Sequence, residues 1–146
     1  MSEQLSGTLA TISPPLPLLE GLTAEFYAFC KAGELRFQKC SDCAAWRHVP
    51  RLRCGGCNST SWRWERSSGQ GVIYSLTTVY RALHPGLDPK TPFICAVVEM
   101  SEGVRVVSEI LVEPGQVPEI GTRVAVVFDA VTQEVTLPKF RMTGRQ

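Results

Sequence analysis

The stretch CSDCAAWRHVPRLRCGGC, residues 40–57, decides the fold of the first half of this chain. It contains two Cys-x-x-Cys pairs, Cys40 with Cys43 and Cys54 with Cys57, separated by ten residues. Each pair can present two sulfurs from one tight turn, and two such turns facing each other complete a tetrahedral Zn²⁺ site with Zn–S distances of about 2.3 Å. The gap is shorter than in the commonest zinc sites, but a small hairpin can return the second pair to the first. The sequence therefore predicts a four-cysteine metal site.

Four protein ligands leave no open coordination position, so we expect the metal to stabilise the fold and not to catalyse a reaction. Iron is the alternative ion, because a tetrahedral thiolate site also accepts it. Gly55 and Gly56 permit the positive φ that such turns often need. Nearby cations would offset the two net negative charges of the site; they are Lys39, Arg47, Arg51 and Arg53.

Composition places the chain among ordinary globular proteins. Its 146 residues are 44% hydrophobic and 20% charged, with a formal net charge of +1, so no strong field attracts nucleic acid or an anionic membrane. No run of about 18 apolar residues occurs, and the first 15 residues lack the basic and apolar regions of a signal peptide. We therefore expect a cytoplasmic protein whose six cysteines are metal ligands or thiols, without disulfides.

Three segments follow one another along the chain. Residues 1–22 show no sustained periodicity and are expected to form an extended arm. In the segment 23–66, Thr23 is predicted to cap a short helix over residues 24–32 that Gly33 ends, and the zinc ribbon with a strand at 35–38 follows. Residues 67–146 form the third segment.

Five stretches of the third segment predict β-strands, because they are rich in β-branched and aromatic residues and are separated by turn-forming glycines and prolines. They are residues 72–80, 93–99, 104–112, 123–128 and 135–142. No helical pattern lies between them. The predicted fold is mainly β, with a short N-terminal helix and a rubredoxin-like zinc ribbon followed by a five-stranded OB-fold barrel, although a sandwich fragment would give a similar pattern.

The remaining candidate residues indicate packing more than chemistry. Three tryptophans bracket the cysteines; they are Trp46, Trp62 and Trp64. We interpret them as the small core of the ribbon and its packing against the barrel, with base stacking or partner anchoring as the alternative. We expect a surface or packing role for His48, and buried thiols for Cys30 and Cys95. His84 lies in a proline-rich loop, residues 82–92, where partner or ligand contact is expected. No nucleophile elbow, phosphate loop or dinucleotide fingerprint occurs, so no catalytic residue is predicted.

An ordered set of motifs covering residues 22–140 resembles a known family. It comprises the aromatic helix, Gly-x-Leu-x-x-Gln at 33–38, the two cysteine pairs around Pro50-Arg51, Trp64, Ser-Gly-x-Gly at 68–71, Ile-Gly-x-x-Val at 120–124 and Leu-Pro-x-Phe at 137–140. The chain resembles the bacterial and archaeal zinc-ribbon/OB-fold proteins associated with acyl-CoA metabolism, long carried as a domain of unknown function. Members of that family bind thiolase-fold enzymes, and some are fused to acyl-CoA hydratases.

The resemblance implies a non-catalytic accessory subunit of a thiolase, aldolase or acyltransferase complex acting on acyl-CoA thioesters. It also implies zinc at Cys40, Cys43, Cys54 and Cys57, with the nucleophile and most of the coenzyme A contacts supplied by the partner. We expect the helix, the arm and the loop 82–92 to contact that partner. The alternatives are a single-stranded nucleic-acid-binding barrel, a stand-alone acyl-CoA binder or carrier, and rubredoxin-like electron transfer through iron.

Overall fold

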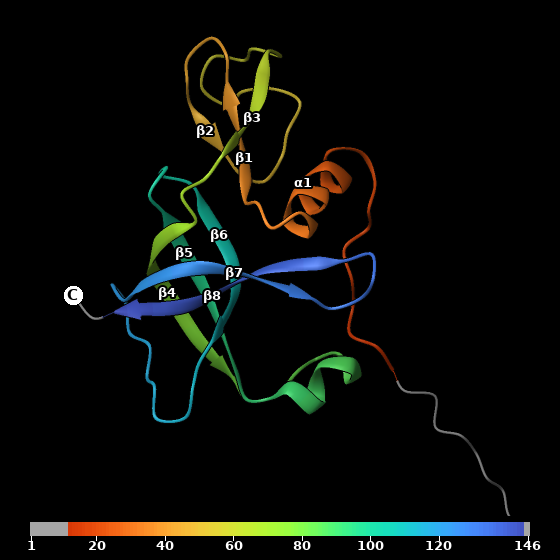
Figure 1. Cartoon of the computed structure of the whole chain (residues 1–146), viewed down its shortest axis with the longest axis vertical. Coiled ribbons are helices and arrows are strands. Elements are labelled where there is room, and N and C mark those ends of the chain that lie inside the picture. Colours follow the sequence, from red (N-terminus) through yellow and green to blue (C-terminus); the bar gives the residue numbers. More distant parts are fainter. Residues whose placement is uncertain (1–11, 145–146) are drawn as a thin grey trace, which may run out of the picture.

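Two small β-structures are stacked along the long axis of the molecule, and one helix lies beside their junction (Figure 1). The computed structural model describes residues 12–144. The cysteine-containing ribbon lies above a closed barrel, and the helix α1 is on one side (Figure 1). The predicted class, a mainly β fold with a short helix, a ribbon and a five-stranded barrel, is confirmed. Within residues 12–144, no helix is long and apolar enough to cross a membrane.

Helix α1 spans Gly21–Lys31 and begins before the predicted N-cap. The carbonyl of Glu20 accepts a hydrogen bond from the backbone N–H of Ala24 at 3.2 Å, which places Thr23 inside the first turn. The prediction of Thr23 as N-cap is therefore wrong. Glu20 takes the extended conformation of an N-cap without a side-chain capping bond, so the path of the backbone sets the start of the helix.

The helix ends as the sequence predicts, at a glycine in the left-handed region. Gly33 has φ +79°, and its N–H donates to the carbonyl of Cys30 at 3.0 Å. The next N–H, of Glu34, donates to the carbonyl of Phe29 at 2.9 Å. This pair of bonds is the Schellman motif, which satisfies carbonyls that the last turn leaves free.

The ribbon is a three-stranded antiparallel sheet with its longest-paired strand in the middle. Strand β1 (Arg36–Cys40) lies between β2 (Trp46–Arg47) and β3 (Trp62–Arg66). The predicted strand at 35–38 overlaps β1, whereas β2 and β3 were not predicted. Because β1 ends at Cys40, the sheet fixes the position of the first ligand of the predicted metal site.

The barrel closes in the strand order β4-β5-β6-β8-β7. Its strands are β4 (Gln70–Val79), β5 (Phe93–Met100), β6 (Arg105–Leu111), β7 (Arg123–Ala130) and β8 (Thr136–Gly144). The β6–β8 pair is parallel and the others are antiparallel, which is the arrangement of a five-stranded Greek-key barrel such as the OB-fold. All five predicted strands overlap observed ones. The loop 82–92 contains a short 3₁₀ helix, η1 (Pro85–Lys90), that the sequence did not predict.

One hydrophobic core runs from the helix through the base of the ribbon into the barrel. Phe26 and Cys30 of α1 and Phe37 of β1 belong to the same buried cluster as the inward side chains of the barrel. The largest barrel members are Ile73, Val98, Ile110, Val124 and Phe140. The helix therefore covers its apolar face with its own chain, which was one of the two interpretations left open by the sequence.

The junction between ribbon and barrel, residues 67–71, is tied down at both ends. The N–H of Ser67 donates to the carbonyl of Leu35 at 2.8 Å, and the carbonyl of Gly69 accepts from Val126 at 2.8 Å. Gly69 has φ +73°, and a Cβ there would lie 2.8 Å from a Val126 methyl carbon. Only glycine fits this position, as its place in the motif at 68–71 anticipates.

Candidate functional site

The structure brings the four ribbon cysteines together. Their sulfur atoms all lie within 4.8 Å of one another. The closest pairs are Cys40 with Cys57 at 3.6 Å and Cys43 with Cys54 at 3.5 Å. Tetrahedral Zn²⁺ with Zn–S distances of about 2.3 Å requires S···S separations of about 3.8 Å, so this donor set fits a tetrahedral metal ion.

Two matching turns produce this cluster. The N–H of Ala44 donates to the carbonyl of Cys40 at 3.1 Å, and the N–H of Asn58 donates to the carbonyl of Cys54 at 2.9 Å. Both Ala44 and Asn58 have φ +62°, directly after the second cysteine of each pair. The expectation that Gly55 and Gly56 supply the positive φ is therefore wrong. Asparagine accepts this conformation readily, whereas alanine at the matching place costs about 1 kcal/mol.

Backbone N–H groups in the turns favour thiolates. Those of Cys43 and Asp42 lower the pKa of Cys40, and those of Cys57 and Gly56 lower the pKa of Cys54 to about 6. The N–H of Ser59 is the largest single influence on Cys57 and lowers its pKa. The neighbouring sulfurs of Cys40, Cys43 and Cys54, together with burial, outweigh it and raise that pKa to about 12. Four thiolates this close repel one another, so all four lose their protons only when a cation lies among them.

Two arginines near the cysteine cluster donate hydrogen bonds to other groups and not to the sulfur atoms. Arg47 donates to the side chain of Gln38 at 2.8 Å and to the carbonyl of Arg51 at 2.9 Å. Arg53 donates to the carbonyl of Asn58 at 3.3 Å. They stiffen the loop between the two cysteine pairs and contribute a positive potential near the site without direct contact.

The tryptophans pack within the ribbon, as predicted, and also against the helix, which the sequence did not predict. Trp62 and Trp64 pack edge to face with their ring centroids 5.4 Å apart. Trp64 also packs on Phe29 of α1, with a centroid distance of 5.5 Å. The indole N–H of Trp64 donates to the carboxylate of Glu25 at 2.7 Å. These contacts attach the helix to the ribbon and leave the indoles occupied by the protein itself.

His48 is a packing residue, as expected, and lies away from the sulfur cluster. Its ring lies 5.1 Å from the ring of Phe26 and 5.2 Å from that of Phe37. Burial lowers the pKa of His48 to about 4, so the imidazole is neutral at pH 7. Cys30 is fully buried, as expected, whereas Cys95 is only partly buried.

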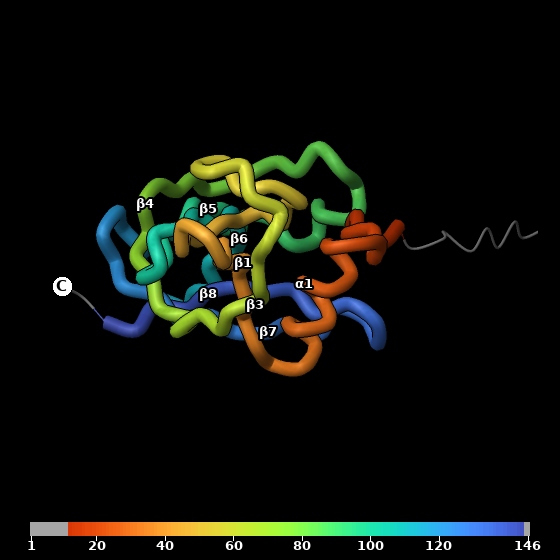
Figure 2. Tube along the Cα trace, turned by 90° about the horizontal axis from the view of Figure 1, so that it is seen from above, coloured from red at the N-terminus to blue at the C-terminus, as the bar shows by residue number. Residues whose placement is uncertain are grey.

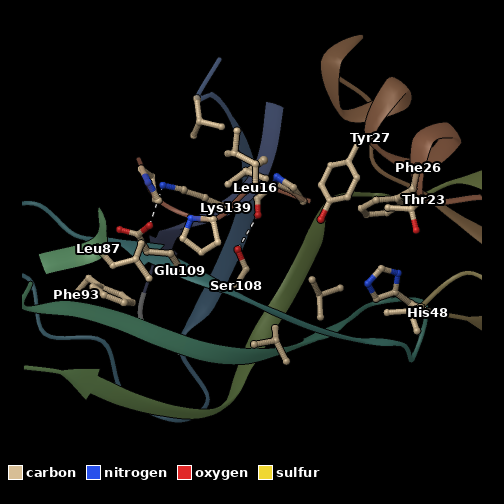
Figure 3. Close-up of a pocket in the computed structure, with 18 of the residues that line it drawn as sticks. Leu16, Thr23, Phe26, Tyr27, His48, Leu87, Phe93, Ser108, Glu109 and Lys139 are labelled. Atoms are coloured by element: carbon tan, nitrogen blue, oxygen red, sulfur yellow. Dashed lines mark hydrogen bonds and ion pairs between the residues drawn. The ribbon is translucent and has the colours of Figure 1, made fainter. Parts of the chain in front are cut away.

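A cavity of about 630 Å³ opens beside the helix, where four parts of the chain meet. Its walls come from the arm (Leu16), α1 (Phe26, Tyr27), the ribbon (His48) and the barrel with η1. Figure 3 shows Tyr27, Phe26, Thr23 and His48 grouped on one side, with Leu87, Phe93 and Glu109 on the other. Sequence reasoning missed this cavity, because its walls are separated by up to about 120 residues and no local pattern links them.

An ion cluster lies at the barrel end of the cavity. The ammonium of Lys139, with its side chain only 8% exposed, lies 2.8 Å from carboxylate oxygens of both Glu109 and Asp129. Burial lowers the pKa of Lys139, but its bonds to Asp129 and Glu109 outweigh that effect and raise the pKa above its usual value. The lysine therefore remains charged, and both carboxylates depend on it.

The arm and η1 lie together along the same side of the barrel as α1 (Figure 2). The ring of His84 caps η1, because its Nδ1 accepts the N–H of Gly86 at 3.0 Å. A Cβ at Gly86 would lie 2.5 Å from backbone atoms of Ser13 and Pro14, so the two segments touch through their main chains. Of the predicted arm, residues 1–11 lie outside the described part of the structure.

Two domain families match consecutive parts of the sequence. Residues 28–63 match the family described as the ChsH2 rubredoxin-like zinc ribbon domain, and residues 64–129 match the family described as the ChsH2 C-terminal OB-fold domain. Together they cover the ribbon and most of the barrel.

Solved structures and curated relatives agree with this match. A chain of the structure titled Ltp2-ChsH2(DUF35) aldolase is 31% identical, with a TM-score of 0.74 over 83% of this chain and 94% of that chain. A DUF35 protein of unknown function from Sulfolobus solfataricus shares the fold, with 13% identity and a TM-score of 0.60.

The curated relatives are longer than this chain. A probable enoyl-CoA hydratase alpha subunit of Thermomonospora curvata is 31% identical over 87% of this chain and 39% of its own length. The 3-oxo-4,17-pregnadiene-20-carboxyl-CoA hydratase alpha subunit of Mycobacterium tuberculosis is 35% identical over 60% of this chain and 27% of its own length.

Proposed function

Because the chain belongs to the family that joins a ChsH2-type zinc ribbon to a ChsH2-type OB-fold domain, we propose that it is a non-catalytic, zinc-binding subunit of a hetero-oligomeric enzyme acting on acyl-CoA thioesters. The similarity to nearly the whole of the chain from the Ltp2-ChsH2 aldolase structure carries this proposal. The description of that structure names two components, Ltp2 and ChsH2. Both curated relatives are named as subunits of hydratases.

The distribution of reactive groups supports a subunit that does not catalyse alone. Neither histidine is paired with a nucleophile in the part of the chain that the structure describes, because His48 packs against phenyl rings and His84 accepts a backbone hydrogen bond. Cys30 is buried, which raises its thiol pKa to about 12. We therefore assign the nucleophile and most contacts with coenzyme A to the partner.

We propose Zn²⁺ as the ion held by Cys40, Cys43, Cys54 and Cys57. The sulfur separations fit a closed tetrahedral site, and the ion would supply folding free energy without chemistry of its own. Iron would also fit the sulfurs, so metal analysis of the purified chain decides between the two.

Three cations of the barrel are paired with carboxylates, which reduces the positive potential that single-stranded nucleic acid would meet. Arg105, Lys139 and Arg141 are each held by a carboxylate, with N···O distances of 2.8 to 3.1 Å. We therefore favour the subunit over the nucleic-acid-binding barrel considered from sequence.

A thiolase-fold protein is the partner that we propose, and a hydratase is the second candidate, because both curated relatives carry that name. The test is a tagged pull-down from the native cell, followed by acyl-CoA assays of the captured protein with and without this chain. We expect a stoichiometric thiolase-fold partner, one zinc per chain, and partner activity that falls when the chain is removed. A chain that captures no acyl-CoA enzyme and restores activity to none would refute the proposal.

A further inference from the structure

The cavity beside α1 has the dimensions of a small-molecule site. Its volume of about 630 Å³ lies within the range of about 300 to 1,000 Å³ typical of ligand sites. Most of its wall is apolar, with Leu16, Phe26, Leu87 and Phe93 among the lining residues. An occupant would therefore gain chiefly from burying apolar surface.

The buried lysine of the cavity is already paired with carboxylates. The ammonium of Lys139 is already bound by Glu109 and Asp129, both at 2.8 Å, and the three charges sum to one negative charge. The hydroxyl of Ser108 is also occupied, since it donates to the carbonyl of Pro138 at 2.6 Å. A carboxylate or phosphate at this buried end would meet the two carboxylates. The other lining lysine, Lys90, is exposed to water, where an ion pair with a ligand would contribute little.

The opposite end offers neutral polar groups. Tyr27 and His48 both line the cavity, and neither side chain has a hydrogen-bond partner within residues 12–144. Burial raises the pKa of Tyr27 and lowers that of His48 to about 4, so both are uncharged at pH 7. The Tyr27 hydroxyl points from the helix toward the space between helix and barrel (Figure 3).

The walls are held in place by packing. The ring of Tyr27 meets Phe26 edge to face at 5.2 Å, and Phe26 packs in turn on His48. On the other side, the arm touches η1 at Gly86 through its main chain. The polar groups therefore keep fixed positions, as a binding site requires.

We propose that this cavity binds an uncharged, largely apolar small molecule bearing a carbonyl or hydroxyl group. The apolar body lies against Leu87 and Phe93, and the polar group meets Tyr27 and His48. The neutral polar end and the saturated lysine argue for this class over fatty acids and free coenzyme A. The inference does not rest on the proposed function, because it concerns the isolated chain.

The test uses the full metal-bound chain and the neutral dye Nile red. We expect saturable binding of one dye per chain, displacement by 2-nonanone, and no displacement by nonanoate or free coenzyme A. Tyr27→Phe keeps the ring and removes the hydroxyl. It should weaken the binding of 2-nonanone by about fivefold to tenfold.

A matched pair of variants locates the site. Val107 lines the cavity and Val117 does not, yet both side chains are 71% exposed, so neither substitution disturbs the core. Val107→Trp should weaken dye binding by about tenfold or more, because the indole takes up ligand space, whereas Val117→Trp should leave it unchanged.

Three results would overturn the proposal. They are equal displacement by nonanoate and 2-nonanone, equal affinity in the two tryptophan variants, and the absence of saturable binding. Binding that appears only after residues 1–11 are deleted would also contradict it, since the cavity would then be the seat of the chain's own N-terminal residues.

Discussion

His48 shows how burial of a single side chain makes stability depend on pH. Its imidazole lies between Phe26 and Phe37, and burial lowers its pKa to about 4, against 6.5 for an unperturbed histidine. The unfolded chain therefore binds a proton at higher pH than the folded chain does. The resulting free-energy cost is absent above pH 6.5 and grows as the pH falls toward 4.

We predict that His48→Phe removes this part of the acid sensitivity. The free energy of unfolding of the parent should fall by about 1 to 3 kcal/mol more than that of the variant between pH 6.5 and pH 4. Urea titrations across this range measure the difference, and comparison of the two proteins cancels the contribution of cysteine protonation. His84→Phe is the control, and parallel pH profiles for parent and His48→Phe would contradict the prediction.

Residue spacing predicted the cysteine cluster but not the ion cluster at Lys139. The two Cys-x-x-Cys pairs are local signals, because each repeats one turn whose geometry the sequence implies. Lys139 and its partners, Glu109 and Asp129, lie on three different strands. Their meeting depends on the strand register of the barrel, which spacing does not encode.

At the scale of elements, the end of α1 depends on one glycine. Gly33 has φ +79°, and nothing lies within 4 Å of a Cβ built there, so a substitution meets backbone strain without a clash. We predict that Gly33→Ala lowers the free energy of unfolding by about 1 kcal/mol. Gly33→Asn should recover most of this loss, because asparagine accepts the left-handed region. Thermal or urea denaturation measures both variants, and equal stability of the two would contradict this account.

We predict that the ribbon depends on a bound metal ion more than the barrel does. We expect chelation to abolish amide protection in β1, β2 and β3, because this sheet has few apolar contacts of its own, while β5 and β6 stay protected. Hydrogen exchange measures protection by strand, and a thiol reagent should find four newly reactive cysteines. Cys30 should remain unreactive as an internal control, since it is fully buried. Loss of protection in β5 at the same rate would show that the metal holds the whole chain together.

Long strands were easier to predict than short ones. The barrel strands carry runs of β-branched residues, which predict strand by composition alone. Strand β2 has only two residues, and β3 (Trp62–Arg66) alternates aromatic with charged residues, so neither segment carries the run of β-branched residues that predicts a strand. They form because the metal turns bring them beside β1, which is tertiary information.

At the scale of the whole molecule, exposed apolar side chains indicate where a partner would bind. Leu83 is 100% exposed and Tyr80 is 78% exposed, both in the segment between β4 and η1. We predict that Leu83→Asp abolishes or strongly weakens co-purification of the partner enzyme, while stability stays unchanged because the side chain packs on nothing. Ile120→Asp, at a position that is 71% exposed on another loop, is the matched control. Equal capture by the two variants would exclude the segment between β4 and η1 as the interface.

The junction at residues 67–71 determines how the ribbon and barrel behave together. Backbone hydrogen bonds join it to Leu35, next to the ribbon, and to Val126 of the barrel. At Gly69 there is no space for a side chain. The two halves therefore cannot swing independently, as they would on a flexible tether. A partner that contacted both the ribbon and the barrel would meet a single preorganised surface. Little conformational entropy would then be lost when the two proteins associate.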